Sequence, residues 1–284
     1  MSGPRWRVSA DPEDIKRPNA ARIYDYLLGG GHNFAADRRA ADDLLRVAPD
    51  IVTAVRANRV FLASTVRYAL AAGIRQVLDL GCGLPTAGSA HRIAHAVDPT
   101  VRVVYVDSDP VVTAAGRLLA RNEHVGVVHA DLRSVDTVLA HPETRRLVDF
   151  GQPLAVLALC VLHFIPGDLS TIADTLRERI SPGSLLAISH ATMPPGEDCA
   201  TKADAVLGLY AQTPTPLHFR PRDQIARLLT GLDLVPPGVV PVNAWDPDGH
   251  RGAGAPVTGL LAAVARKPDP LPIWMADVRG ASRC

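Results

Sequence analysis

The hydrophobic pattern of the chain divides it into two regions. From residue 18 to about residue 72, apolar residues recur at helix spacing, with a break at the three glycines 29–31. Two further segments, 34–47 and 51–72, carry their charges on one face, as amphipathic helices do. The pattern therefore predicts a helical region over residues 18–72.

After residue 73, short apolar runs alternate with amphipathic stretches. The predicted strands are 76–80, 101–106, 126–129, 154–159, 185–189, 234–240 and 257–264. The predicted helices between them are 86–97, 110–122 and 169–180. Strands that alternate with helices of this length indicate βαβ units and a largely parallel sheet. The continuous apolar run at 154–159 is typical of a central strand covered on both faces.

The last two apolar runs are separated only by a Pro- and Gly-rich stretch around residues 242–256, which predicts a closing hairpin at one edge of the sheet. The fold class is thus α/β, with a mostly parallel sheet of seven strands and helices on both faces. We expect a tail over 1–17, a helical lid or cap over 18–72, a ligand-binding α/β domain over 73–267 and an irregular tail over 268–284.

Composition narrows the classes of partner. The 284 residues carry 30 basic and 29 acidic side chains, a net charge of +1, so the charge footprint of a nucleic-acid binder is missing. The four cysteines are far apart and include no C-x-x-C pair, which favours a reducing compartment over a disulfide framework. The N-terminus does not resemble a secretory signal, and the most apolar run, 153–165, is too short to span a bilayer. We therefore expect a cytoplasmic protein with no nucleic-acid or membrane partner.

A strand that runs into a glycine turn carries the first chemical signal. Asp79 is followed by Gly81-Cys82-Gly83. In open α/β folds, ligands bind at the carboxyl ends of the strands, where the strand order switches. Glycines at such a place let the backbone approach a ligand, and the next helix presents free N–H groups. This spacing alone is a weak signal of a ligand site, so the ends of the neighbouring strands must be compared with it.

Acidic residues also end the next two predicted strands. Asp107 can accept hydrogen bonds from both hydroxyls of a ribose, and Asp131 can accept one from an adenine amine. Taken singly, each aspartate is better explained by a helix cap or a solvated turn. Three at successive strand ends predict an adenosine site. A nicotinamide dinucleotide remains an alternative, although the third glycine of its G-x-G-x-x-G fingerprint is displaced to Gly88.

These strand ends resemble the class I S-adenosylmethionine-dependent methyltransferases, and the chain is most similar to one sparsely characterised family among them. The resemblance covers about residues 18–267 and rests on seven stretches: PNAARIYDYLLGGGHNFAADR (18–38), VRANRVFL (55–62), VLDLGCGLPTAG (77–88), VVYVDSDPVV (103–112), VLHFIP (161–166), PGSLLAISHAT (182–192) and GLDLVPPGVVPVNAW (231–245). Family members often carry Gly-Lys-Asp-Asn or Gly-Lys-His-Asn where this chain has residues 30–33 without the lysine. No role of that lysine's charge is therefore carried over.

The resemblance implies a Rossmann-like class I methyltransferase fold with an N-terminal helical lid, and S-adenosylmethionine as cofactor. It implies that Gly81 and Gly83 lie under the methionyl part, that Asp107 holds the ribose, and that Asp131 and Leu132 hold the adenine. The other expected cofactor residues are Asp79, Cys82, Ser108, Tyr24, Gly30, Asn33 and Arg59. Arg59 is expected to pair with the cofactor carboxylate. The glycine break before Asn33 is read as a lid hinge, with an ordinary helix–helix turn as the alternative.

Catalytic candidates follow the fourth and fifth strands. Methyl transfer from a sulfonium requires alignment and exclusion of water more than any obligatory side chain. His163 and His190 are candidate bases or substrate contacts, and the alternative is packing at the strand ends. Cys160 is interpreted as a small core residue, and Trp245 either lines the acceptor pocket or closes the core. His91 and His95 have i,i+4 spacing but no third ligand nearby, so no metal site is expected.

The leading hypothesis is a methyltransferase that acts on an unidentified small molecule of secondary metabolism. One alternative is a protein that binds S-adenosylmethionine as a sensor or as a partner of another protein, without methyl transfer. Another is an enzyme that uses the cofactor for different chemistry, such as attack by the cofactor's own amine. An NAD(P)-dependent oxidoreductase is the last. The sequence gives neither the acceptor, nor the methylated atom, nor the oligomeric state, nor the pathway.

Overall fold

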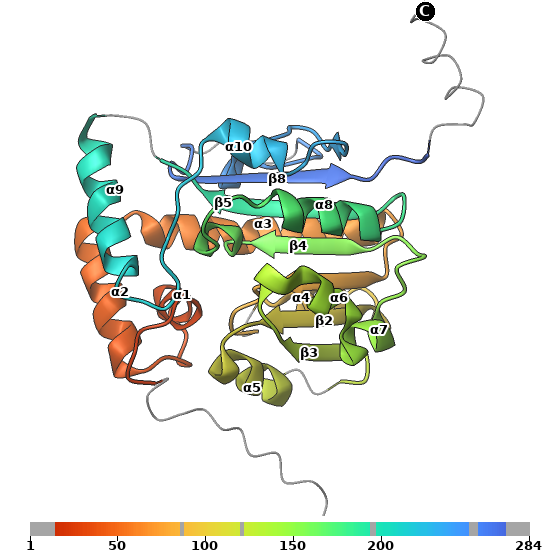
Figure 1. Ribbon diagram of the computed structural model, residues 1–284, viewed down its shortest axis with the longest axis horizontal. Helices are drawn as coiled ribbons and strands as arrows, with labels where there is room; N and C mark the ends of the chain where they lie inside the picture. Colours follow the sequence, from red (N-terminus) through yellow and green to blue (C-terminus); the bar gives the residue numbers. More distant parts are fainter. Residues whose placement is uncertain (1–14, 86–87, 120–121, 194–196, 250–254, 271–284) are drawn as a thin grey trace, which may run out of the picture.

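A single sheet forms the centre of the molecule (Figure 1). The computed structural model describes residues 15–85, 88–119, 122–193, 197–249 and 255–270. In these residues the sheet has eight strands in the order β3-β2-β1-β4-β5-β8-β6, and β7 also pairs with β8. The strands are β1 (Gln76–Leu80), β2 (Arg102–Asp107), β3 (Val125–His129), β4 (Ala155–Leu159), β5 (Leu185–Ala191), β6 (Asp233–Leu234), β7 (Val240–Pro241) and β8 (Leu260–Arg266).

The first five strands run parallel, as the alternating pattern predicts. In the centre, Leu78 of β1 pairs with Val104 of β2 on one side and with Val156 of β4 on the other. Every residue of β1, β4 and β5 is buried, because both faces of these strands are covered by other elements. The predicted α/β class with a mostly parallel sheet is confirmed.

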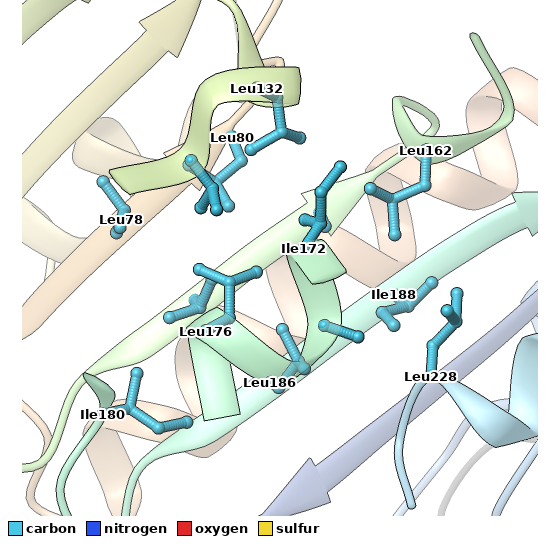
Figure 2. Close-up of a cluster of buried hydrophobic side chains, with 14 of the residues drawn as sticks. Leu78, Leu80, Leu132, Leu162, Ile172, Leu176, Ile180, Leu186, Ile188 and Leu228 are labelled. Atoms are coloured by element: carbon cyan, nitrogen blue, oxygen red, sulfur yellow. The ribbon is translucent and has the colours of Figure 1, made fainter. Parts of the chain in front are cut away.

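Helices cover both faces of the sheet. They are α1 (Ala20–Leu27), α2 (Ala35–Val47), α3 (Ile51–Ala71), α4 (Ala90–His95), α5 (Pro110–Leu119), α6 (Val135–Ala140), α7 (Pro142–Leu147), α8 (Ser170–Arg179), α9 (Glu197–Tyr210) and α10 (Arg222–Arg227), with 3-10 turns η1 (Leu132–Ser134), η2 (Leu162–Phe164) and η3 (Val242–Ala244). Residues of α6, α8 and α10 pack on one face, where Ile172 and Leu176 of α8 lie against the strands (Figure 2). Helices α3 and α4 pack on the other. Trp245 is fully buried there, in edge contact with Phe61 and Tyr68, so it closes the core.

The edge of the sheet differs from the prediction in detail. The run 234–240, predicted as one strand, forms the two short strands β6 and β7, and both pair antiparallel with β8. Pro236 and Pro237 separate them, because proline has no N–H to donate to a ladder. Strand β8 therefore lies between β5 and β6, and the outer arm of the predicted hairpin is divided into two short strands.

Other differences concern helices. Helices α6, α7, α9 and α10 were not predicted. Parts of two predicted helices, residues 86–87 and 120–121, lie outside the described residues, and so do residues 1–14 and 271–284 of the predicted tails. None of the described helices is both long and apolar enough to cross a membrane.

Helices α1, α2 and α9 gather beyond one end of the sheet and form what we call the helical cap (Figure 1). They share a separate apolar core that includes Ile23, Leu44, Val206 and Tyr210. Residues of the N-terminal region thus pack with residues far along the chain. The expected domain boundaries at 17, 72 and 267 remain predictions.

A buried ion triad connects the helical cap to the sheet. The guanidinium of Arg22 on α1 donates from Nε to Asp37 of α2 and from Nη1 to Asp109, each at 3.0 Å. All three side chains are buried. Asp109 follows β2 and also accepts the backbone N–H groups of Val111 and Val112 at the start of α5. The triad therefore joins two cap helices to the end of a central strand.

We expect the substitution D37N to lower the free energy of unfolding by about 3–5 kcal/mol, because it removes one partner of a buried charge network. Urea denaturation of the variant measures this. The matched control is R227M, which breaks an exposed ion pair with Asp223 on α10 and should cost less than about 1 kcal/mol. Equal effects of the two substitutions would contradict a structural role for the triad.

Candidate functional site

A cavity of about 650 Å³ lies where the parallel strands meet the helical cap. This is an ordinary volume for a small-molecule site, typically about 300–1,000 Å³. Asp79 from β1, Asp107 from β2 and Asp131 after β3 all line it, together with Ser108 and Leu132. The structure thus brings together the three strand-end aspartates that the sequence singles out.

The turn after β1 forms the floor of the cavity. The N–H groups of Gly81 and Cys82 both donate to the carbonyl of Val106, at 2.8 and 3.1 Å, and so fold the turn against the end of β2. Gly81 has a φ of 65°, and a Cβ built there would lie 2.1 Å from a methyl group of Val161. Only glycine fits both the backbone conformation and the space. Gly83, with a φ of 59°, donates its N–H to Asp107 at 2.9 Å.

Two buried carboxyl groups face this turn. Burial raises the pKa of Asp79 to about 7, although the nearby guanidinium of Arg59 opposes the shift. Burial likewise raises the pKa of Asp107 to about 6, against the N–H groups of Asp109 and Gly83, which favour the ionised form. Among the described residues, none donates a hydrogen bond to the Asp79 side chain. Its oxygens are therefore available to a ligand in the cavity.

Arg59 on α3 supplies positive charge to the same cavity. Its Nε is enclosed and has no hydrogen-bond partner, and its guanidinium lies over the ring of Tyr24 at 5.1 Å from the centroid. Tyr24 is itself fixed, because its hydroxyl donates to the carbonyl of Val55 and accepts from Asn58, both at 3.0 Å. A fixed guanidinium that borders the cavity is suited to a carboxylate.

Asp131 lies at the exposed margin of the cavity. Its carboxylate caps η1 by accepting the N–H of Arg133 at 2.8 Å, and it also accepts from the Arg133 guanidinium. This hydrogen-bonded partner lowers the pKa of Asp131. The capping interpretation of an isolated aspartate thus describes Asp131 in part, but the residue still lines the cavity.

Gly30 and Asn33 are not among the residues that line the cavity. The side-chain amide of Asn33 donates to Asp25 at 3.0 Å and to the carbonyl of Gly30 at 2.8 Å. A Cβ at Gly30 would lie 2.2 Å from an oxygen of Asp25. Both residues therefore shape the turn between α1 and α2, and the expected direct contact with a cofactor has no support in this geometry.

The two candidate histidines differ in position. His163 lines the cavity, and its Nδ1 accepts the N–H of Ala191 at 3.1 Å. His190 is fully buried and lies outside the lining. Its Nδ1 donates to the carbonyl of Ala191 at 2.7 Å, and its Nε2 accepts from Arg220 at 3.0 Å. Because both nitrogens of His190 are occupied, the geometry gives no support to a role as base or substrate contact.

Several lining residues were missed from the sequence or interpreted differently. Cys160, expected in the core, lines the cavity with a φ of 53°, a strained value for a residue other than glycine. Its N–H donates to the hydroxyl of Ser189, which in turn donates to Asn58 at 2.7 Å. Burial raises the pKa of the Cys160 thiol to about 11. An apolar wall also lines the cavity, formed by Val206 and Tyr210 of the unpredicted helix α9 and by Leu217 and Phe219 from the segment that follows it.

The paired histidines on α4 serve the core. His91 donates its backbone N–H to the hydroxyl of Tyr105 and contacts that hydroxyl again through Nδ1, both at 2.8 Å. Burial lowers the pKa of His91 to about 4. Within the described ranges, no group of three or more metal-ligating side chains is found.

The raised pKa of Asp79 makes stability depend on pH. The folded protein holds this proton up to about pH 7, whereas the usual pKa is 3.8. The contribution of Asp79 to the free energy of unfolding is therefore complete below pH 3.8. It falls by roughly 1.4 kcal/mol per pH unit above that value and is lost as the pH rises through 7. We expect D79N to be more stable than the natural chain at pH 8, with a smaller difference at pH 5, in urea denaturation.

The control is D223N, on an exposed aspartate of α10, which should follow the natural chain at both values of pH. Asp107 titrates in all three proteins, so only the difference between variant and natural chain reports on Asp79. A D79N protein with an unchanged pH dependence would show that Asp79 is ionised without cost.

Comparison with known proteins places this site in a family. A family model described as S-adenosyl methyltransferase matches residues 7–268. A DUF574 family protein from Streptomyces avermitilis is 35% identical with a TM-score of 0.82, over 90% of this chain and 99% of that one. A protein from Thermobifida fusca, described as a "putative methyltransferase", is 34% identical with a TM-score of 0.83, over 92% of this chain and 100% of that one. No curated protein matches the chain.

The plantazolicin methyltransferase BamL is 12% identical with a TM-score of 0.51, over 88% of this chain and 96% of that one, which is a likeness of fold alone. The strand order and the two close structures confirm the expected class I methyltransferase fold. The family model spans most of the chain, and both close relatives exceed 30% identity along nearly their whole length. The chain belongs to the S-adenosyl methyltransferase family.

Proposed function

We propose that the protein transfers a methyl group from S-adenosylmethionine to a small-molecule acceptor. The observation that carries this proposal is the convergence of Asp79, Asp107 and Arg59 on one cavity at the carboxyl ends of the strands. Two buried carboxyl groups beside a guanidinium are suited to a ligand that carries both positive and negative charge. S-adenosylmethionine is such a ligand, and membership of the family implies its use.

The residues present fit the parts of this cofactor. Asp107 would accept the ribose hydroxyls, and Asp79 would accept from the ammonium group. Arg59, whose guanidinium borders the cavity, would donate to the carboxylate. The turn at Gly81 and Gly83 lets the backbone lie close to the methionyl part, because a side chain at Gly81 would meet Val161. Of the remaining candidates, Asp131, Leu132 and Ser108 would border the adenosine, Tyr24 would support Arg59, and Cys82 would border the methionyl part.

The bound cofactor supplies a methyl group on a positively charged sulfur, which is electrophilic without further activation. The protein's own task is then to align an acceptor and to exclude water. The helical cap serves the second purpose by covering the carboxyl ends of the strands with apolar side chains, among them Val206 and Tyr210.

The extent of the cavity favours transfer over simple binding of the cofactor. Beyond Asp79 and Asp107, the cavity continues to Phe164 and to Leu217 and Phe219 near the cap. A protein that only senses the cofactor would not need this second space. In such a protein, side chains would fill the position next to the cofactor's sulfur. The apolar wall and the small net charge of +1 both support a small acceptor rather than a nucleic acid.

Binding of S-adenosylhomocysteine, measured by calorimetry, is the first test. We expect D107A to weaken this binding by about 1–3 kcal/mol, because the ribose hydroxyls lose their acceptor. D223N on the surface of α10 should bind like the natural chain. If the natural chain fails to bind S-adenosylhomocysteine at high micromolar concentration, the proposed function is wrong. Fluorescence of NADPH with added protein tests the oxidoreductase alternative.

The assignment of Arg59 has a sharper test in two ligands. S-adenosylhomocysteine carries the amino-acid carboxylate, whereas methylthioadenosine lacks it. We expect R59M to weaken binding of the first by about 10-fold or more and to leave the second within about threefold. R67M, on an exposed arginine of the same helix, is the control. Equal losses for the two ligands would mean that Arg59 does not meet the carboxylate.

A further inference from the structure

The cavity has a second half that the cofactor residues do not use, and it bears on the identity of the acceptor. We call it the acceptor half, and its walls come from helix α9 of the helical cap, from the segment that follows α9 and from the loop after β4. It is lined by Cys160, His163, Phe164, Val206, Tyr210, Leu217 and Phe219. The charged side chains Asp50 and Lys202 also border the cavity, but both are exposed, whereas the walls are mostly apolar. This argument rests on the proposed function.

Aromatic rings shape the acceptor half. The ring centroids of Phe164 and Tyr210 are 5.5 Å apart, and the two ring planes are tilted by 42°. The ring of His163 packs edge-on against Phe164, with 4.4 Å between the centroids. Rings held in such positions offer faces and edges to a flat ligand. The shape and the apolar character together favour an acceptor with a flat, apolar skeleton.

His163 offers this ligand a hydrogen-bond donor. Its Nδ1 accepts the N–H of Ala191, so the neutral ring carries its hydrogen on Nε2. No described residue pairs with Nε2, and this atom is not among the enclosed polar atoms without a partner, so it reaches the cavity. Burial, with His190 and Arg220 nearby, lowers the pKa of His163 far below its usual range and keeps the ring neutral. A neutral ring in this tautomer donates from Nε2 and cannot take a proton there.

A buried arginine fixes this arrangement. Arg220 donates to the carbonyls of Leu162 at 3.2 Å, Ile165 at 2.8 Å and Gly167 at 2.7 Å, which all belong to the loop that carries His163. It also donates to His190, whose ring packs edge-on against His163 at 5.4 Å. The loop, the ring and its tautomer are therefore held by one buried network.

No described side chain of the acceptor half is a base near neutral pH. Burial raises the pKa of the Tyr210 hydroxyl, and that of the Cys160 thiol to about 11, so both stay protonated. Burial also raises the pKa of Tyr24, which borders both halves. The carboxyl groups of Asp79 and Asp107 belong to the cofactor half. An acceptor that must lose its proton inside the cavity would find no partner to take it.

We infer that the acceptor is a flat, apolar oxygen acid, a phenol or enol that is ionised near neutral pH, and that its oxyanion accepts a hydrogen bond from His163 Nε2. Its proton is lost to water before binding. A lone pair on this oxygen forms the bond to the methyl carbon, and the bond from that carbon to sulfur breaks with its electron pair left on sulfur. The two opposite charges disappear together, and no proton passes to the protein.

Three fluorescent coumarins test this inference on protein saturated with S-adenosylhomocysteine. They are 7-hydroxycoumarin, which ionises near neutral pH, 7-aminocoumarin, which presents N–H donors, and 7-methoxycoumarin, which cannot ionise. We expect 7-hydroxycoumarin to bind about 10-fold or more tightly than the other two. Its excitation spectrum separates the anion from the neutral dye, and we expect the bound dye to be the anion.

Two variants of His163 make the test specific to Nε2. In H163N the side-chain oxygen can still accept the N–H of Ala191, but nothing donates at the position of Nε2. In H163Q the amide N–H reaches the position of Nε2. We expect H163N to lose the preference for 7-hydroxycoumarin and H163Q to keep it within about threefold. Far-UV circular dichroism and urea denaturation of both variants show whether they are folded.

The inference is overturned if 7-hydroxycoumarin does not bind, if the three dyes bind equally, if the bound dye is neutral, or if folded H163N keeps the preference. Failure of the proposed function is a separate result, because binding of S-adenosylhomocysteine is measured first and without any dye. If that binding fails, the proposed function is wrong, and if it succeeds while the preference among the dyes is absent, only the inference about the acceptor is wrong.

Discussion

The arrangement of this molecule depends on one buried charge network, the guanidinium of Arg22 between the carboxylates of Asp37 and Asp109. Charges removed from water are tolerated only when they are paired and fully hydrogen-bonded. Asp37 meets this condition through two further donors, the N–H groups of Asn19 and Phe34. The network therefore requires α1, α2 and the end of β2 to be in place together.

This requirement connects the helical cap to the cofactor residues. The N–H of Asp109 donates to Asp107 at 3.0 Å, so the residue that anchors the cap also orients the carboxylate proposed to hold the ribose. On the cap side, the turn read as a lid hinge is tied down, since Asp25 accepts from the N–H of His32 at 2.8 Å and from Asn33. Buried polar contacts therefore hold the helical cap in place over the carboxyl ends of the strands. This arrangement is closer to an ordinary packed helix–helix turn than to a free hinge.

Sequence alone predicted the parts of the site that depend on local order along the chain. The strand ends at Asp79 and Asp107 were found because an apolar run, an acid and a glycine turn follow one another directly. Helix α9 was missed, although Ala203, Val206 and Tyr210 recur at helix spacing and are buried. The ion triad has no local signal, since its members are 15 and 87 residues apart. The tautomer of His163 likewise depends on a backbone N–H 28 residues away, which no spacing reveals.

The electrostatics of the cavity impose an order on the two proposed ligands. Asp79 and Asp107 resist ionisation in the folded chain because burial deprives their charges of water. A cationic ligand beside them compensates for this loss, so the cofactor gains from both carboxylates. An anionic acceptor faces the opposite situation, because ionised carboxylates repel it in a cavity where charges are weakly screened. This repulsion is reduced once the ammonium group of the cofactor lies beside Asp79. The same two aspartates therefore favour binding of the cofactor first and of the acceptor second, without any movement of the cap.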